Sequence, residues 1–230
     1  MDNKMGFTQG GAGMLTGVRR PLYLSSATSQ TITIVRDASG SMTGAKASDA
    51  TAATVDLVDE LAKPENKDGF RVAIVDFAER ASVVQAAIKA TALVGQVKAL
   101  DTSSFGAMTN ITEGLSHAAT VIEQAASAPA EGRIALRPVA LLYSDGCHNR
   151  GNAPHAQGDR VKAVADLVTV AFGGDADEQL LKQLSTSPQH FYRVKNGREL
   201  RMFLATVGKT LTSTMARGTN ATVALSRIHT

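Results

Sequence analysis

Apolar residues follow two alternating patterns along the chain, short runs and helical spacings. Short apolar or β-branched runs predict strands over 31–35, 70–77, 139–143, 167–172 and 191–194. Between them, apolar residues recur at intervals of three and four, which predicts helices over about 47–61, 111–126, 159–166, 177–184 and 197–211. The last of these opens on Asn196 and Glu199, which resemble a capping box. Strands alternating with helices are typical of a mostly parallel sheet covered on both faces.

The segment 81–87 is expected to form a further strand, antiparallel to 70–77, because the link between the two is too short for a crossover helix. The predicted fold class is therefore α/β, a doubly wound, mostly parallel central sheet with one antiparallel edge strand and helices on both faces. Residues 1–28 are expected to form an extended N-terminal arm, 29–212 the domain and 213–230 a C-terminal tail. The short segments 22–24 and 221–225 are candidates for an added edge strand, and at least one is expected to pack that way.

Length and composition suit one globular domain. The chain of 230 residues can bury a single α/β core, and its 43% hydrophobic and 20% charged residues are ordinary values. Its apolar runs are shorter than the roughly 18–20 residues that a membrane span needs. The N-terminal segment lacks the apolar core of a secretory signal, and the single cysteine, Cys147, fits a reducing compartment. We therefore expect a cytoplasmic protein.

The charge is modest, +3 overall, and unevenly distributed. From Arg193 onward the chain carries seven Lys or Arg residues and one acid, Glu199. A basic stretch of this kind is more often a solvated helix face than a contact for nucleic acid, so no nucleic-acid partner is expected.

Oxygen-bearing side chains follow two of the predicted strands and precede one helix. Asp37, Ser39 and Ser41 come directly after the first strand, and Asp145 follows the strand 139–143. Thr109 lies on the loop that opens the helix over 111–126. Ligand sites in open parallel sheets lie beyond the carboxyl ends of the strands, so these five side chains are expected to converge there.

The chemistry of these five side chains favours a hard cation. Hydroxyl and carboxylate oxygens suit Mg²⁺, Mn²⁺ or Ca²⁺ better than zinc. Gly40 permits the tight turn that brings Ser39 and Ser41 toward one point. Two neighbouring carboxylates also favour a bound cation, because like charges otherwise repel.

The same residues resemble the metal-ion-dependent adhesion site (MIDAS) of the von Willebrand factor A (VWA) domain family, whose pattern is D-x-S-x-S, then a distant Thr, then a distant Asp. Asp37-x-Ser39-x-Ser41, Thr109 and Asp145 match it in order, and the resemblance covers about residues 30–210. It implies that Ser39, Ser41 and Thr109 bind metal directly, with Asp37 and Asp145 binding mainly through water. Ser-Gly-Ser-Met, Thr-Asn-Ile and Ser-Asp-Gly are most similar to bacterial intracellular members, such as the VWA proteins of tellurium-resistance and related stress operons.

The resemblance implies a protein-binding module rather than an enzyme. Neutral direct ligands leave much of the charge of a bound Mg²⁺ unneutralised, so an open position can accept an Asp or Glu of a protein partner. The rim expected to meet that partner consists of Met42, Asn110, Cys147 and His148. The loop after Asp145 departs from the common family pattern at Cys147-His148, so partner specificity is not carried over from relatives.

Two other hypotheses remain open. Asp37 after the first strand suggests a metal-dependent phosphohydrolase, although Ser39 stands where such an enzyme needs a second acid. An assembly protein that self-associates through its terminal segments is the third hypothesis.

Residues 40–46 lack the glycine spacing of a phosphate-binding loop, and Cys147, His148 and His155 are too loosely spaced to favour zinc. Asp76, inside a predicted strand, is expected to make a polar contact at the strand end.

Overall fold

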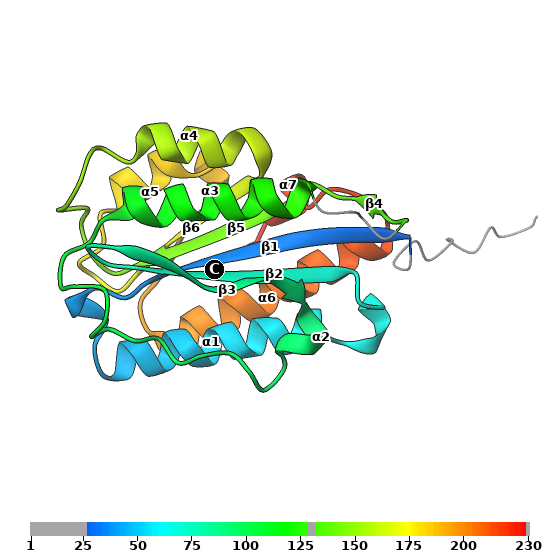
Figure 1. The fold of residues 1–230 in the computed structure, drawn as a ribbon, viewed down its shortest axis with the longest axis horizontal. Coiled ribbons are helices and arrows are strands. Elements are labelled where there is room, and N and C mark those ends of the chain that lie inside the picture. The colour runs from blue at the N-terminus through cyan, green and yellow to red at the C-terminus, as the bar shows by residue number, and fades with distance from the viewer. Residues whose placement is uncertain (1–26, 128–131, 229–230) are drawn as a thin grey trace, which may run out of the picture.

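The computed structural model describes residues 27–127 and 132–228. Its central sheet has the order β3-β2-β1-β5-β6-β7, and a short strand, β4, pairs with the beginning of β1 (Figure 1). The strands are β1 (Thr28–Asp37), β2 (Phe70–Phe77), β3 (Ala81–Lys89), β4 (Ile134–Ala135), β5 (Val139–Ser144), β6 (Asp166–Phe172) and β7 (Phe191–Val194). Among the described residues, β3 is antiparallel to β2 and the remaining pairings are parallel. The predicted fold class is confirmed.

Helices cover both faces of the sheet. One face carries α1 (Ala45–Leu61), α2 (Ala90–Leu93) and α6 (Gly197–Ala216); the other carries α3 (Ile111–Ser127), α4 (His155–Val164) and α5 (Glu178–Leu184) (Figure 1). Short 3₁₀ turns, η2 (Gly40–Met42), η3 (Pro64–Asn66) and η4 (Pro188–His190), and a last helix, α7 (Thr222–Leu225), complete the described chain. Asn196 caps α6 as expected, since its side chain accepts a hydrogen bond from Glu199 N at 3.0 Å.

Successive residues of the central strands enter two separate cores, because side chains alternate across a sheet. Ile32 and Ile34 of β1 pack with α1 and α6, whereas Val35 packs with α3 and α4. In β5, Leu141 likewise belongs to the core beneath α1 and α6, and Leu142 to the core beneath α3 and α4. This double burial explains why the central strands read as nearly continuous apolar runs.

A buried ion pair interrupts this apolar pattern. Arg36 and Asp76 are register partners on β1 and β2, and their side chains form two hydrogen bonds of 2.6 and 2.8 Å. Arg36 is fully buried and also donates to Lys98 O at 3.0 Å, which ties the loop after α2 to the sheet. The expected polar contact of Asp76 is therefore confirmed.

Two expectations need correction. The segment 221–225 is not a strand: Thr222–Leu225 is helix α7, because Ala221 and Leu225 are one helical turn apart and both are fully buried. The candidate strand at 22–24 lies outside the described residues. The helix expected near 159–166 begins earlier and ends sooner, at His155–Val164, and Asp166 already belongs to β6.

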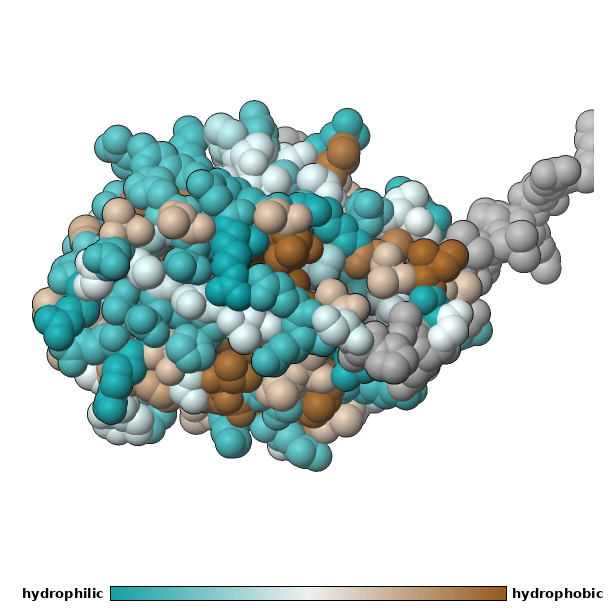
Figure 2. All heavy atoms as spheres, turned by 45° about the horizontal axis from the view of Figure 1, so that its top comes forward, coloured by the Kyte–Doolittle hydropathy of each residue, from teal (hydrophilic) through white to brown (hydrophobic). Residues whose placement is uncertain are grey.

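The surface carries hydrophobic residues that are scattered among hydrophilic ones, as Figure 2 shows for one side. Exposed large hydrophobic residues of the described chain lie on different elements, among them Val94, Met108, Met202 and Val223. Within 27–127 and 132–228, no helix has the length and apolar character needed to cross a bilayer.

Candidate metal centre

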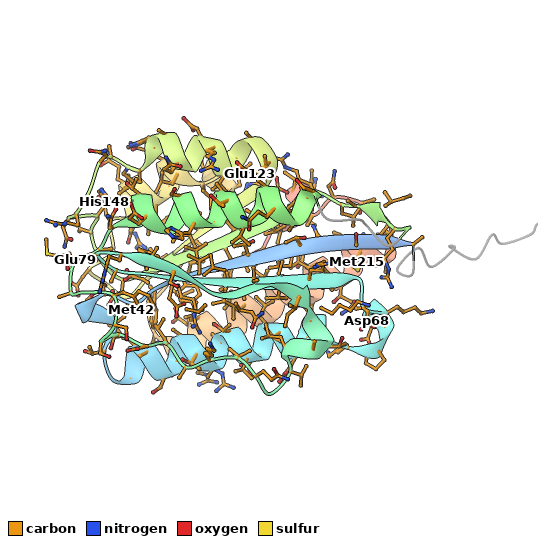
Figure 3. All side chains as sticks on the ribbon, viewed as in Figure 1. Met42, Asp68, Glu79, Glu123, His148 and Met215 are labelled. Atoms are coloured by element: carbon orange, nitrogen blue, oxygen red, sulfur yellow. The ribbon has the colours of Figure 1, made fainter. Side chains whose placement is uncertain are left out.

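Three segments that are distant in sequence meet at the carboxyl end of the sheet. Asp37 is the last residue of β1, Asp145 directly follows β5, and Thr109 lies two residues before α3. Because β1 and β5 are adjacent parallel strands, their ends lie at the same edge. This edge is on the left in Figure 3, where Met42, Glu79 and His148 are labelled.

Hydrogen bonds connect the predicted metal residues. Ser39 N donates to Asp37 Oδ1 at 2.8 Å, and Ser39 Oγ lies 3.0 Å from Ser41 Oγ. The Ser41 hydroxyl donates to Asp145 Oδ1 at 2.6 Å. The second oxygen of Asp37 accepts a hydrogen bond from Ser144. Four of the five predicted residues thus form one connected group.

Thr109 borders the same space through Gly146. A Cβ atom placed on Gly146 would lie 3.0 Å from Thr109 Oγ1 and 3.5 Å from Ser41 Oγ, so both hydroxyls adjoin this glycine. Asn149 fixes Thr109 there with two backbone contacts: its Oδ1 accepts from Thr109 N at 2.8 Å, and its N donates to Thr109 O at 3.0 Å. The structure therefore brings all five predicted residues together.

The loop of Ser39 and Ser41 is also tied to the loop of Thr109. Gly40 N donates to Ala107 O at 3.0 Å, and a Cβ on Gly40 would contact Ala107 at 3.4 Å. Ser39 and Thr109 are buried, whereas Ser41 is exposed. The group of oxygen atoms therefore opens to the surface on the side of Ser41.

The electrostatics of this group are unusual, because two fully buried carboxylates lie close together. Burial raises the pKa of Asp37 to about 6, although hydrogen bonds from Ser144 and Ser39 oppose this shift; the nearby charge of Asp145 also raises it. Lys46, in the first turn of α1, forms an ion pair with Asp145. One of the two buried carboxylates is therefore paired with an ammonium.

The rim differs from the expectation in two residues. Met42, the last residue of η2, is fully buried in the core, and Asn110 is buried with its side chain bonded to Glu79 O and to Glu113 N. Neither residue is available to a partner, so their assignment to the rim is wrong. Cys147 is exposed, as expected of a rim residue, and Met108, the residue before Thr109, is also exposed.

His148 connects two loops of the site. Its Nδ1 accepts a hydrogen bond from Ile111 N, the first residue of α3, at 3.2 Å, and its Nε2 lies 2.9 Å from Asn152 O. An acceptor Nδ1 carries no proton, so Nε2 is the donor to Asn152. Burial lowers the pKa of His148, which favours this neutral form. His148 therefore holds the loop after β5 against the start of α3.

Three residues of the site were not anticipated from the sequence: Lys46, Ser144 and Asn149. Ser144 is the last residue of β5 and bonds to Asp37, while Asn149 holds Thr109. The sequence offers one indication of their role, because each is a polar residue within a few residues of a predicted metal ligand. Their partners lie 40 or more residues away in sequence, which local patterns do not reveal.

A family model for the von Willebrand factor type A domain matches residues 31–206. The chain belongs to the VWA family. Domains of this family are typically metal-dependent interaction or adhesion modules, and their MIDAS binds divalent metals. Among curated proteins, none matches this sequence.

Solved structures share the fold of this chain at low sequence identity. Proximal thread matrix protein 1 (PTMP1) of the mussel byssus has a TM-score of 0.66 and 17% identity, over 84% of this chain and 49% of the mussel chain. The vWF domain of the pilus tip protein Mfa5 from Porphyromonas gingivalis has a TM-score of 0.65 and 13% identity, over 82% of this chain and 97% of that domain. This VWA chain spans about half the length of PTMP1, of which another structure has a zinc-occupied MIDAS motif.

The residues of this VWA domain fit a divalent cation. Two buried carboxylates and three hydroxyls form a compact set of hard oxygen donors, and a cation there would neutralise the charge that burial disfavours. Ser39, Ser41 and Thr109 would supply neutral oxygens, while Asp37 and Asp145 would supply the negative charge.

The raised pKa of Asp37 predicts a pH dependence of the metal-free protein. The folded state binds this proton more tightly than the unfolded state, whose carboxyl titrates near 3.8, so stability should fall as pH rises from about 4 to about 6. At about 1.4 kcal/mol per pKa unit, Asp37 should account for a loss on the order of 1–3 kcal/mol. Urea unfolding of chelator-treated protein across this range measures it. Asp37→Asn should remove this part of the slope, and an unchanged slope would contradict the assignment.

Proposed function

We propose that this VWA domain is a Mg²⁺-dependent protein-binding module, in which an Asp or Glu of the partner completes the coordination of the metal. The observation that carries the proposal is the convergence of Ser39, Ser41 and Thr109 with two buried carboxylates at one surface opening. Hard, uncharged oxygen ligands suit Mg²⁺, and Mn²⁺ or Ca²⁺ can occupy the same donor set.

The burial pattern supports an open coordination position. Asp37 and Asp145 lie beneath the surface, whereas Ser41 is exposed, so an approaching partner meets the hydroxyl side of the site first. A carboxylate that meets an incompletely neutralised cation gains more than an exposed salt bridge, which contributes roughly 0–1 kcal/mol. Cys147 and Met108 are exposed, lie within two residues of Asp145 and Thr109 in sequence, and are the proposed contacts around the metal.

The same geometry favours binding over hydrolysis. The position two residues after Asp37 holds Ser39, whose hydroxyl contacts Ser41, so this position supplies a hydroxyl and not the second acid of an aspartyl-phosphate enzyme. His148 is engaged with Ile111 and Asn152 and serves as a link between loops. We therefore propose that the domain has no catalytic activity.

The motif sequences support a more specific setting. Ser39–Met42, Thr109–Ile111 and Ser144–Gly146 are similar to those of bacterial intracellular VWA proteins, so we propose a cytoplasmic role in a stress or defence system of the tellurium-resistance type. Growth of a deletion strain in tellurite, with and without the restored gene, tests this setting. Unchanged tellurite sensitivity would argue against it.

Metal-dependent capture tests the binding function. The immobilised chain is incubated with lysate in Mg²⁺, and bound proteins are eluted with chelator, identified, and measured individually by calorimetry. Thr109→Ala should weaken the identified complex at least about tenfold, because one direct ligand is lost without a change in charge. Thr120→Ala, an exposed threonine on α3, is the matched control and should have no effect.

A complex that keeps its full affinity in chelator would place the binding face elsewhere on the domain. Self-association is the other outcome that the same capture reveals, because the eluted partner would then be this chain itself. A sedimentation measurement with and without chelator would establish whether the metal site takes part.

A further inference from the structure

Lys46 occupies an unusual place next to the candidate metal centre. It lies in the first turn of α1, and its ammonium bonds to Asp145 Oδ2, while the Ser41 hydroxyl bonds to Oδ1 of the same carboxylate at 2.6 Å. Both oxygens of Asp145 are therefore engaged from within the chain. One of the two positions is held by a positive charge.

The ammonium reaches this position from the surface. The side chain of Lys46 is 36% exposed and that of Asp145 is fully buried, so the pair spans the boundary between solvent and the interior. A Cβ on Gly173 would lie 3.9 Å from Lys46 Nζ, which places the ammonium between the loops that follow β5 and β6. A flexible lysine at such a boundary can leave without unfolding the helix that carries it.

The pairing also matters for the charge of the site. Asp37 and Asp145 are both fully buried, and burying a carboxylate without a positive partner is costly. With Lys46, one of them is compensated. The same positive charge repels a divalent cation that approaches the same carboxylate.

We propose that Lys46 is a built-in counter-ion that a divalent metal displaces from Asp145, so that the metal affinity of the domain is set by competition with this ammonium. The proposal rests on the proposed metal site and adds a residue that opposes occupancy. Lys46 stabilises the metal-free state and weakens metal binding, and these two effects have the same origin.

Replacement of Lys46 separates this role from a purely structural one. In Lys46→Met, the Kd for Mg²⁺ and Mn²⁺ measured by calorimetry should fall by about tenfold or more, because a unit charge a few ångströms away is removed. The same variant should melt at a lower temperature than the wild type in chelator, and its metal-induced rise in Tm should be larger. A residue that merely supports the fold would lower Tm without tightening metal binding.

Two further variants act as controls. Lys63→Met removes a comparably exposed ammonium just beyond the other end of α1, where it pairs with Glu60, and should leave metal affinity unchanged. Lys46→Arg keeps the positive charge and should restore an affinity close to that of the wild type. If Lys46→Met is poorly folded, Lys46→Gln provides the same test with a polar side chain.

The outcomes distinguish the two proposals. If the wild type binds metal and the affinity of both Lys46→Met and Lys46→Gln is equal to or weaker than that of the wild type, the proposed competition is wrong and the metal site stands. Absence of metal binding in the wild type and in both variants overturns the metal site as well. Binding that is detectable only after Lys46 is replaced supports the competition in its strongest form.

Discussion

Asp76→Ala is expected to lower the free energy of unfolding by about 3–5 kcal/mol, the usual cost of leaving one partner of a buried ion pair uncompensated. Arg36 is fully buried, and Asp76 provides two of the three hydrogen bonds that its guanidinium makes. Urea unfolding monitored by circular dichroism measures the effect. The loop after α2 should also become more open to proteolysis, since Arg36 anchors it at Lys98 O.

The surface offers a matched control for this prediction. Arg201 and Asp56 form a similar two-bond pair, at 2.7 and 3.2 Å, on exposed side chains of α6 and α1. Asp56→Ala should cost no more than about 1 kcal/mol. The double variant Arg36→Met, Asp76→Leu should recover much of the loss, because it leaves no unpaired charge. Equal costs for Asp76→Ala and Asp56→Ala would show that burial does not decide the strength of these pairs.

The double variant Ser39→Ala, Ser41→Ala is expected to lose calorimetrically detectable Mg²⁺ binding, a weakening of about a hundredfold or more. Two of three proposed direct ligands disappear, and a loss of about 1.4 kcal/mol for each corresponds to a factor of ten per ligand. The fold should survive, because Asp37 is held by the backbone N of Ser39 and by Ser144. The Mg²⁺-induced rise in Tm should vanish with the binding.

Ser103→Ala, Ser104→Ala is the matched control, because these two serines bond to the exposed carboxylate of Asp101, which is not one of the predicted metal ligands. It should leave the metal affinity unchanged. Gly146→Ala provides an independent approach, since its methyl group would lie 3.0 Å from Thr109 Oγ1 and crowd the space that the hydroxyls border. Full Mg²⁺ affinity in the double serine variant would show that the metal, if bound, lies elsewhere.

The fold could be predicted from the sequence where a segment's environment is uniform along its length. The run Val139–Tyr143 is buried on both faces, so its apolar composition alone identified a central strand. The wrong prediction of a strand at 221–225 arises because this segment is short and only part of it contacts the core. Five residues are too few to distinguish period 2 from period 3.6, and the contact of Ala221 and Leu225 with the core decides for helix.

The metal residues could be predicted because their positions are tied to strand ends, and parallel strands bring those ends together whatever lies between them. Strand topology does not determine whether a side chain on a connecting loop points into the core or toward solvent. Met42 follows Ser41 directly, yet η2 turns one into the core and leaves the other exposed. The pairing of Lys46 with Asp145 joins residues 99 positions apart, and depends on how α1 approaches the loop after β5.

The long separation between these residues has a consequence for folding kinetics. Ser41 and Asp145 are 104 positions apart and meet only when β1 and β5 have paired around the intervening chain. Contacts of such high sequence separation form late, because loop closure must come first. A cation that needs both segments would therefore find no complete site in the folding transition state. The bound metal would therefore stabilise the native state by lowering the unfolding rate, and would leave the folding rate unchanged.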